Sequence, residues 1–222
     1  MDIKLTDSLG NNRWFRQGIP HRDNLPAVEW ASGSKEWYNN GKPHRDNDLP
    51  ALELSNGDKE WYSCGYLHRD GNLPAIEHNN GTRQWFVNNK RHRDDGPAFV
   101  DNYKAEWWVN GRLHRGNDLP ALEYKSGAKK WYYYGRKHRR GGEAAVEYAN
   151  GAKEWWIYGN QYTKMQVKSG LKICRWYKQM VQRQFILLVW KVMTPIYFHP
   201  SQPGGKKAIR DLIEFDDKIS II

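Results

Sequence analysis

Six His-Arg pairs recur along the chain at a near-constant interval, and such a histidine ladder is a candidate metal site. Successive pairs lie 22 to 24 residues apart and begin at His21, His44, His68, His92, His114 and His138. If each interval holds two β-strands, neighbouring histidines lie about 10 Å apart. A metal ion holds its ligands at about 2 Å, so two such histidines cannot share one ion. We expect each pair to tie a loop to a sheet, and we expect no metal site.

A second candidate chemistry rests on glutamates that recur in pairs. If each hairpin turn has two residues, Glu53 faces Glu60. The same arithmetic gives two further pairs, Glu29 with Glu36 and Glu147 with Glu154. Two carboxylates can serve as acid and base in an enzyme, but three copies one repeat apart are not the pattern of an active site. Like charges directly opposite each other are unfavourable, so each pair needs a neutralising partner.

The arginines of the His-Arg pairs are the expected partners. A guanidinium suits a carboxylate because its N–H groups match two oxygens. The arginines are Arg22, Arg45, Arg69, Arg93, Arg115 and Arg139, and the fourth repeat has Val100 in the glutamate position. No nucleophile–base set accompanies them, and residues 204–207 lack the full spacing of a phosphate-binding loop. We expect no catalytic residue, no cofactor and no small-molecule substrate.

The elements that position these residues form a tandem repeat. One anchor tryptophan marks each unit, at Trp14, Trp37, Trp61, Trp85, Trp107, Trp131 and Trp155. A fixed interval of this length is typical of repeat proteins, in which each unit buries its apolar face against its neighbours. Only 39% of the 222 residues are hydrophobic and the mean hydropathy is -0.93, yet there are twelve Trp and thirteen Tyr. Aromatic rings therefore supply much of the expected buried area.

Within each unit the pattern predicts a β-hairpin. Residues 50–54 alternate apolar and polar side chains, as a half-buried strand does. Asn56-Gly57 then indicates a type I′ turn, whose two central residues need positive φ, and residues 59–62 form the second strand. A two-residue turn places Leu52 opposite Trp61. By the same register Ile76 faces Trp85 and Val146 faces Trp155.

A second glycine follows the tryptophan in most units, and Asn89 replaces it in one. Asparagine is the non-glycine residue that best tolerates the left-handed conformation, so this substitution indicates a backbone requirement. Two units are irregular: the fourth hairpin is one residue shorter than its neighbour, and the sixth loop, residues 140–144, lacks the proline. We interpret both as drift within the array.

The C-terminal part differs in charge and pattern. Residues 1–159 carry 24 basic and 21 acidic side chains, whereas residues 160–222 carry 11 and 4. Residues 171–193 have apolar side chains at helical spacing, and residues 206–215 form a shorter segment of the same kind beyond a Pro/Gly linker. Basic side chains mostly occupy other faces of the first helix. The candidate partner-binding residues are Lys172, Arg175, Lys178, Arg183 and Lys191. An acidic protein surface, anionic lipid or nucleic acid would suit them.

The repeated unit, W-[YFW]-x-x-G-x-x-H-R-…-L-P-A-x-E-…-[NS]-G-…-W, resembles the variant MORN repeat that is abundant in giant DNA viruses of the marseillevirus group. The resemblance covers about residues 14–159. It implies a mainly β fold of tandem β-hairpins in an elongated, twisted antiparallel sheet, without catalytic residues. The expected organisation is a lead-in over residues 1–13, the repeats over 14–159, and a basic C-terminal segment over 160–222 with one or two helices. The structural repeat residues include Trp37, Trp61, Trp85, Trp107, Trp131, Trp155, His44, Arg45, His68 and Arg69.

These features favour a non-enzymatic scaffold that contacts other proteins. The resemblance to giant-virus proteins favours a virion setting, as a minor capsid or capsid-associated component whose partners are capsid proteins. The alternative is an intracellular adaptor that binds acidic host proteins or anionic membrane lipids through the basic segment. Two cysteines form no disulfide framework, and neither a signal pattern nor an apolar run of eighteen residues occurs. We expect the protein in the virion or the host cytoplasm, neither secreted nor transmembrane.

Overall fold

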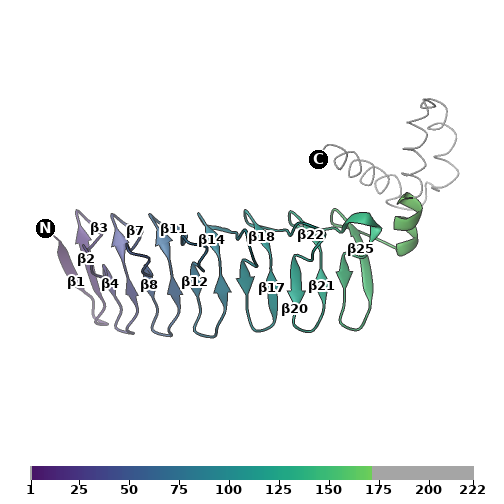
Figure 1. Cartoon of the computed structure of the whole chain (residues 1–222). Coiled ribbons are helices and arrows are strands. Elements are labelled where there is room, and N and C mark those ends of the chain that lie inside the picture. The colour runs from purple at the N-terminus through teal and green to yellow at the C-terminus, as the bar shows by residue number, and fades with distance from the viewer. Residues whose placement is uncertain (1, 172–222) are drawn as a thin grey trace, which may run out of the picture. The chain divides into compact units, whose positions relative to one another are not determined.

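The computed structural model describes residues 2–171 and is mainly β (Figure 1). Two compact units divide the chain, one made of Met1–Arg115 with Ala121–Ser126 and the other of Gly116–Pro120 with Gly127–Ile222. Both are built from antiparallel hairpins in tandem, so the predicted fold class is confirmed.

The first unit contains an antiparallel sheet in which each strand pairs with the next one named. The order is β1 (Ile3–Thr6), β2 (Asn12–Arg16), β4 (Val28–Glu29), β5 (Lys35–Glu36), β8 (Leu52–Glu53), β9 (Lys59–Glu60), β12 (Ile76–Glu77), β13 (Arg83–Gln84), β16 (Phe99–Val100), β17 (Lys104–Glu106) and β20 (Leu122–Tyr124). The predicted lead-in over residues 1–13 contains β1, which pairs with β2 and so extends the sheet.

A second, smaller hairpin follows each anchor tryptophan, and the sequence analysis did not predict it. In the first unit these are β6 (Tyr38–Asn39) with β7 (Lys42–Pro43), β10 (Tyr62–Ser63) with β11 (Tyr66–Leu67), β14 (Phe86–Val87) with β15 (Lys90–Arg91), and β18 (Trp108–Val109) with β19 (Arg112–Leu113), while β3 (Ile19–Pro20) pairs with β2. The turn of the β6–β7 hairpin has positive φ at Asn40 (48°) and Gly41 (76°), as a type I′ turn requires. At Asn89 φ is 64°, so the left-handed conformation inferred from its substitution for glycine is confirmed.

The second unit has the same construction over fewer repeats. Its main strands are β21 (Lys129–Lys130), β24 (Val146–Glu147), β25 (Lys153–Ile157) and β26 (Asn160–Tyr162), and its small hairpin joins β22 (Tyr132–Tyr133) to β23 (Arg136–Lys137). A short 3-10 turn, η1 (Arg140–Gly142), lies in the sixth loop. Residues 164–171 are helical.

The loops of the main hairpins contain three residues, so the predicted register is wrong. The N–H of Leu54 donates to the carbonyl of Asp58, and the N–H of Gly57 donates to that of Leu54. Of the three loop residues only Gly57 has positive φ, at 89°, which is a type I turn followed by a left-handed glycine. Leu52 therefore faces Glu60, and Glu53 faces Lys59. One extra loop residue moves every pairing by one position.

The same shift removes the expected carboxylate pairs. Glu29 faces Lys35 and Glu147 faces Lys153, rather than a second glutamate. Ile76 faces Gln84 instead of Trp85, and Val146 faces Glu154 instead of Trp155. The predicted glutamate pairs are therefore replaced by a row of alternating acidic and basic side chains. Opposite charges on neighbouring strands are favourable.

The fourth hairpin is one residue shorter than the others because its turn is one residue shorter. The N–H of Asp101 donates to the carbonyl of Lys104, which leaves Asn102 and Tyr103 as a two-residue loop. Phe99 then faces Glu106, and this pairing is equivalent to that of Leu52 with Glu60. The shorter loop keeps the register of the array intact, and it leaves Tyr103 exposed at the tip.

One face of the sheet, here called the tryptophan face, carries the core of each repeat. The N–H of Trp61 donates to the carbonyl of Ala75, and Trp37 donates likewise to Ala51, so each tryptophan lies opposite an alanine of the following repeat. Trp37 and Trp61 are 6% exposed and the two alanines are fully buried. Alanine is small and so leaves room beside each indole ring, which an arginine of the following loop covers.

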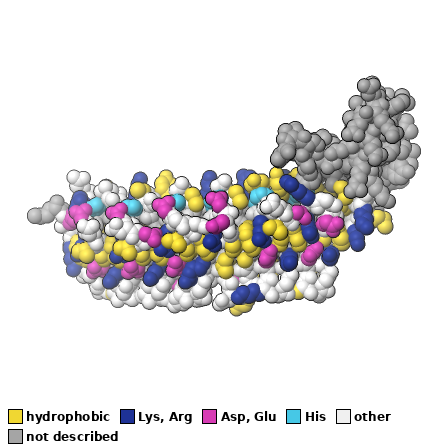
Figure 2. All heavy atoms as spheres, in the orientation of Figure 1, with side chains coloured by type: hydrophobic (Ala, Val, Ile, Leu, Met, Phe, Trp, Pro, Cys, Tyr) yellow, Lys and Arg dark blue, Asp and Glu magenta, His cyan; other side chains and the backbone are white. Residues whose placement is uncertain are grey.

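The opposite face, here called the tyrosine face, carries Glu36, Tyr38, Glu60 and Tyr62, since residues two apart on a strand point the same way. Strand pairing places Leu52 between the two glutamates. Figure 2 shows one side of the molecule, on which hydrophobic side chains form a band bordered by acidic, basic and histidine side chains. The side chains around Leu52 are only half-buried.

A helix packs against the last hairpin of the second unit. Thr163 and Gln166 form a reciprocal cap: the N–H of Gln166 donates to the Thr163 hydroxyl, and the N–H of Thr163 donates to the Gln166 side-chain oxygen. Val167 is 2% exposed and packs with Ile157, while Leu171 lies against the same cluster. The sequence analysis did not predict this helix over residues 164–171, and the predicted helix over 171–193 lies outside the described residues except for Leu171, as does the whole segment over 206–215.

The sixth loop is not drift, because its glycine makes room for this helix. A Cβ atom on Gly142 would clash with the Leu171 Cδ1 atom and would lie 3.1 Å from the Val167 Cγ1 atom. The Leu171 side chain would therefore have to move to admit this Cβ atom, and the contact with Val167 would be tight. Within the described residues, no helix is both long and apolar enough to cross a bilayer.

Candidate functional site

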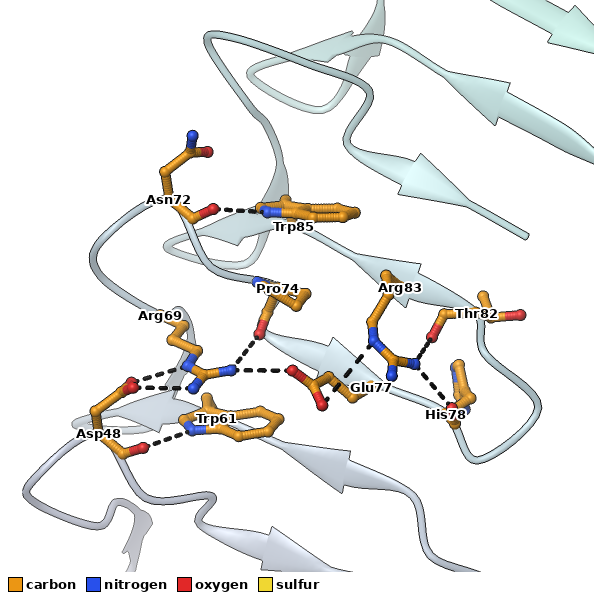
Figure 3. A network of polar contacts seen from close by, with 10 residues as sticks. All are labelled: Asp48, Trp61, Arg69, Asn72, Pro74, Glu77, His78, Thr82, Arg83 and Trp85. Carbon is orange, nitrogen blue, oxygen red and sulfur yellow. Dashed lines mark hydrogen bonds and ion pairs between the residues drawn. The ribbon is translucent and has the colours of Figure 1, made fainter. Parts of the chain in front are cut away.

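One arginine organises the polar contacts of each repeat, and Figure 3 shows the example of Arg69. Its Cζ atom lies 3.8 Å from the centroid of the Trp61 ring. Its Nε and Nη2 atoms contact the two oxygens of Asp48 at 2.8 and 2.9 Å, and its Nη1 atom donates to the Pro74 carbonyl and to Glu77. The side chain is 13% exposed. A guanidinium that stacks on an indole and binds two carboxylates joins the loop to the sheet.

The same arrangement recurs through the array. The Cζ atom lies 3.7 to 4.1 Å from the indole centroid in six pairs, Arg22–Trp14, Arg45–Trp37, Arg69–Trp61, Arg93–Trp85, Arg115–Trp107 and Arg139–Trp131. Five of these arginines contact a glutamate, as the sequence predicts, in the pairs Arg22–Glu29, Arg45–Glu53, Arg69–Glu77, Arg115–Glu123 and Arg139–Glu147. Arg93 has Val100 in that position and contacts Asn72 and Asp95 instead.

The stacking of arginine on tryptophan was not anticipated, although the sequence contains a signal for it. Each arginine follows its tryptophan by eight residues in every repeat, while the repeat length itself varies from 22 to 24. An offset that stays constant while the period changes indicates direct contact between the two side chains. Trp155 is the exception: the Lys164 Nζ atom lies 5.6 Å from its ring centroid, and no arginine among residues 2–171 stacks on it.

The histidines join neighbouring repeats. His44 Nε2 lies 3.1 Å from Asp46, and its Nδ1 accepts the backbone N–H of Cys64 in the turn of the following small hairpin. His21 makes the same two contacts, with Asp23 and with the N–H of Asn40. Because Nδ1 accepts a hydrogen bond, the proton of the neutral ring lies on Nε2 and points to the carboxylate. His68 likewise contacts Asp70, at 3.0 Å.

On the tyrosine face, Glu36 and Glu60 have neutral partners. Glu36 accepts hydrogen bonds from the Trp30 indole at 2.7 Å and from the Tyr38 hydroxyl at 2.8 Å. Glu60 accepts one from the Tyr62 hydroxyl at 2.9 Å. Burial and the bond to Glu36 raise the pKa of Tyr38 to about 12, and burial and Glu60 raise that of Tyr62 further. Among the described residues, no lysine or arginine pairs with Glu36 or Glu60.

The fourth repeat contains a cation at the corresponding place. Arg91 lies at the end of β15, where the second repeat has Pro43 and the third has Leu67. Its guanidinium carbon lies 5.0 to 5.4 Å from three aromatic rings, those of Phe86, Phe99 and Trp108. Its Nη2 atom donates to Gln84, and its Nη1 atom lies 3.7 Å from Glu106. Burial lowers the pKa of Arg91, against the opposing effect of Glu106.

In the sixth repeat Lys137 takes the position of Arg91. The Lys137 Nζ atom lies 4.1 Å from the Trp156 ring centroid. The pKa of Glu154 is lowered mainly by hydrogen bonds from Tyr148 and Trp156, and the charge of Lys137 lowers it further. A carboxylate beside aromatic rings thus attracts a cation from the chain itself in two repeats, although the sequence analysis did not identify this face.

Of the predicted site residues, the repeat tryptophans, histidines and arginines lie at the contacts just described between loops and sheet and between neighbouring repeats. The predicted partner-binding residues Lys172, Arg175, Lys178, Arg183 and Lys191 lie outside the described part of the chain. Within residues 2–171, no group of three His, Cys, Asp or Glu side chains is arranged to hold a metal ion. Comparison with models of protein families and with curated proteins finds no match to the chain.

Proposed function

We propose that the protein is a non-enzymatic scaffold that acts through surface contacts with other proteins. The observation that carries the proposal is the repeated Arg–Trp–Glu contact. The side chains of each repeat that could best take part in a reaction, such as Arg69 and His44, instead bind the loops and neighbouring repeats of their own chain. Side chains used in this way stabilise a surface and are poorly placed to transform a substrate.

A virion setting is the favoured context, as a minor capsid or capsid-associated component. Its support is the resemblance of the repeat to the variant MORN repeats of marseilleviruses. The alternative is an intracellular adaptor that binds acidic host proteins or anionic lipids through residues 160–222, and the excess of 11 basic over 4 acidic side chains there favours it.

Quantitative mass spectrometry of purified virions tests the setting. A copy number comparable with that of other capsid components, retained after salt washes, is expected for a capsid-associated scaffold. Absence from virions would contradict that setting, and residues 160–222 would then serve as bait for host partners. An enzymatic activity of the protein that disappears in His44→Ala or His68→Ala would contradict the non-enzymatic role.

A further inference from the structure

The tyrosine face of the second and third repeats has the same strand arrangement around Pro43 that surrounds Arg91 in the fourth repeat. Around Pro43, strand order brings Glu36 and Glu60 to either side of Leu52. Around Arg91, the same order brings Gln84 and Glu106 to either side of Phe99. Glu36 and Glu60 therefore take the positions that Gln84 and Glu106 occupy around Arg91.

The charges at the two places differ. Around Arg91 one carboxylate, Glu106, is balanced by Arg91 at 3.7 Å and by Lys104 at 2.6 Å. Around Pro43 there are two carboxylates, and their hydrogen bonds come from neutral tyrosine and tryptophan donors. Two half-buried carboxylates beside apolar side chains attract a guanidinium or ammonium group strongly, because screening by water is reduced there.

We propose that the tyrosine face around Pro43 binds a basic side chain from residues 172–193 of a second copy of this chain. An arginine inserted there would lie over Leu52 between Glu36 and Glu60, with the rings of Tyr38 and Tyr62 beside it. Arg91 makes contacts of this kind within its own chain. This assembly rests on the proposed scaffold function and specifies one contact that the scaffold makes.

The choice of occupant follows from charge and composition. Residues 172–193 contain five basic side chains and no acidic one, and the run Arg175-Trp176-Tyr177-Lys178 places aromatic rings between two cations. Such a run offers both a partner for each carboxylate and rings to lie on Leu52 between them. Because one copy contributes the face and another the segment, two copies can exchange these contacts in a two-fold dimer, or successive copies can join head to tail.

Sedimentation equilibrium of the full chain measures this association. We expect self-association that weakens as salt is raised. The double variant Glu36→Gln/Glu60→Gln removes both charges while keeping acceptors for the tyrosine hydroxyls, and it should weaken association at least tenfold. The matched control Glu29→Gln/Glu53→Gln removes the same charge from the tryptophan face of the same repeats. It should leave association unchanged, and circular dichroism verifies that each variant is folded.

A mixing experiment identifies the occupant. The variant Glu36→Lys/Glu60→Lys retains a normal basic segment, and Arg175→Glu/Lys178→Glu retains a normal face. Each should be monomeric alone, whereas an equimolar mixture should form a one-to-one complex, because the intact face of one copy meets the intact segment of the other.

Three outcomes would overturn the proposal: a monomeric full chain at about 100 µM, equal effects of the two Glu→Gln pairs, or no complex in the mixture. If the mixture forms no one-to-one complex and each double variant still self-associates when measured alone, the copies associate through another surface. A monomeric chain that is nevertheless abundant in virions would refute this contact and leave the scaffold function standing.

Discussion

The guanidinium of Arg69 lies flat against the indole of Trp61, with its carbon 3.8 Å from the ring centroid, and this contact recurs in each of the first six repeats. The tryptophan belongs to a strand and the arginine to the loop that folds back over it. The face of the guanidinium stacks on the indole, and its N–H groups form ion pairs at the edge. Two kinds of interaction with different distance dependence therefore hold the loop in place.

Replacing Arg69 by lysine should destabilise the protein by about 2–3 kcal/mol, because lysine cannot stack and bind Asp48 through two N–H groups together. Arg93→Lys is the matched control. Arg93 stacks on Trp85 in the same way but has Val100 where Arg69 has Glu77, so a loss of about 1 kcal/mol is expected. Urea unfolding followed by tryptophan fluorescence measures both. Equal losses would show that the ion pairs of Arg69 with Asp48 and Glu77 contribute no more than the ion pair of Arg93 with Asp95.

The row of alternating charges gives a second prediction, which also tests the strand register. Lys59 faces Glu53 on one side and Glu77 on the other. Lys59→Glu should therefore destabilise by about 1–2 kcal/mol, since two attractions become two repulsions. Lys59→Gln removes the attraction alone and should cost less than half as much. The difference between the variants should shrink in about 1 M salt, and a difference independent of salt would argue against this register.

The sequence predicts the repeat unit, the hairpins and the left-handed second glycine, because each depends on local pattern. It does not predict the register. Asn56-Gly57 suits a type I′ turn, but it equally suits a type I turn with only Gly57 left-handed, and the choice depends on how strands of adjacent repeats align. The main and small hairpins also differ in turn type, although both contain glycine.

Charge matching predicts the arginine–glutamate contacts even though the assumed register was wrong. A long guanidinium side chain reaches its carboxylate from the loop whichever residue faces that glutamate across the strand. The cation position on the tyrosine face is different. Its recognition requires knowing that Arg91, Pro43 and Leu67 are equivalent, and that equivalence appears only once the small hairpins are seen.

Packing of the helix against the sixth loop gives a third prediction. Gly142 and Gly141 both have positive φ, at 72° and 69°, so alanine at either position costs about 1 kcal/mol of backbone strain. Only at Gly142 would the new Cβ also meet Leu171 and Val167, while at Gly141 nothing lies within 4 Å. We expect Gly142→Ala to cost about 2–3 kcal/mol and to expose Trp155 to a fluorescence quencher. Gly141→Ala should leave quenching unchanged, and equal quenching in both would contradict the packing.

Burial of His138 gives the last prediction, a dependence of stability on pH. Its ring is stacked on that of Tyr158, with centroids 4.4 Å apart and planes at 4°, and the residue is 4% exposed. Burial, assisted by the charge of Arg140 and opposed by Asp118, lowers the pKa of His138 to about 4. The folded state therefore holds the neutral ring, while the unfolded chain takes up a proton near pH 6.5. Stability is fully present above pH 6.5 and declines as the pH falls towards 4.

The expected loss from this histidine is about 3 kcal/mol between pH 7 and pH 4. His138→Phe keeps a ring in the stack and removes the titration, so its free energy of unfolding should decline less over the same interval. Carboxylates that titrate at lower pH are present in both proteins and cancel in the comparison. Urea unfolding at half-unit steps from pH 7 to pH 4 measures the difference. Parallel curves for the two proteins would mean that folding does not lower the pKa of His138, and would contradict this prediction.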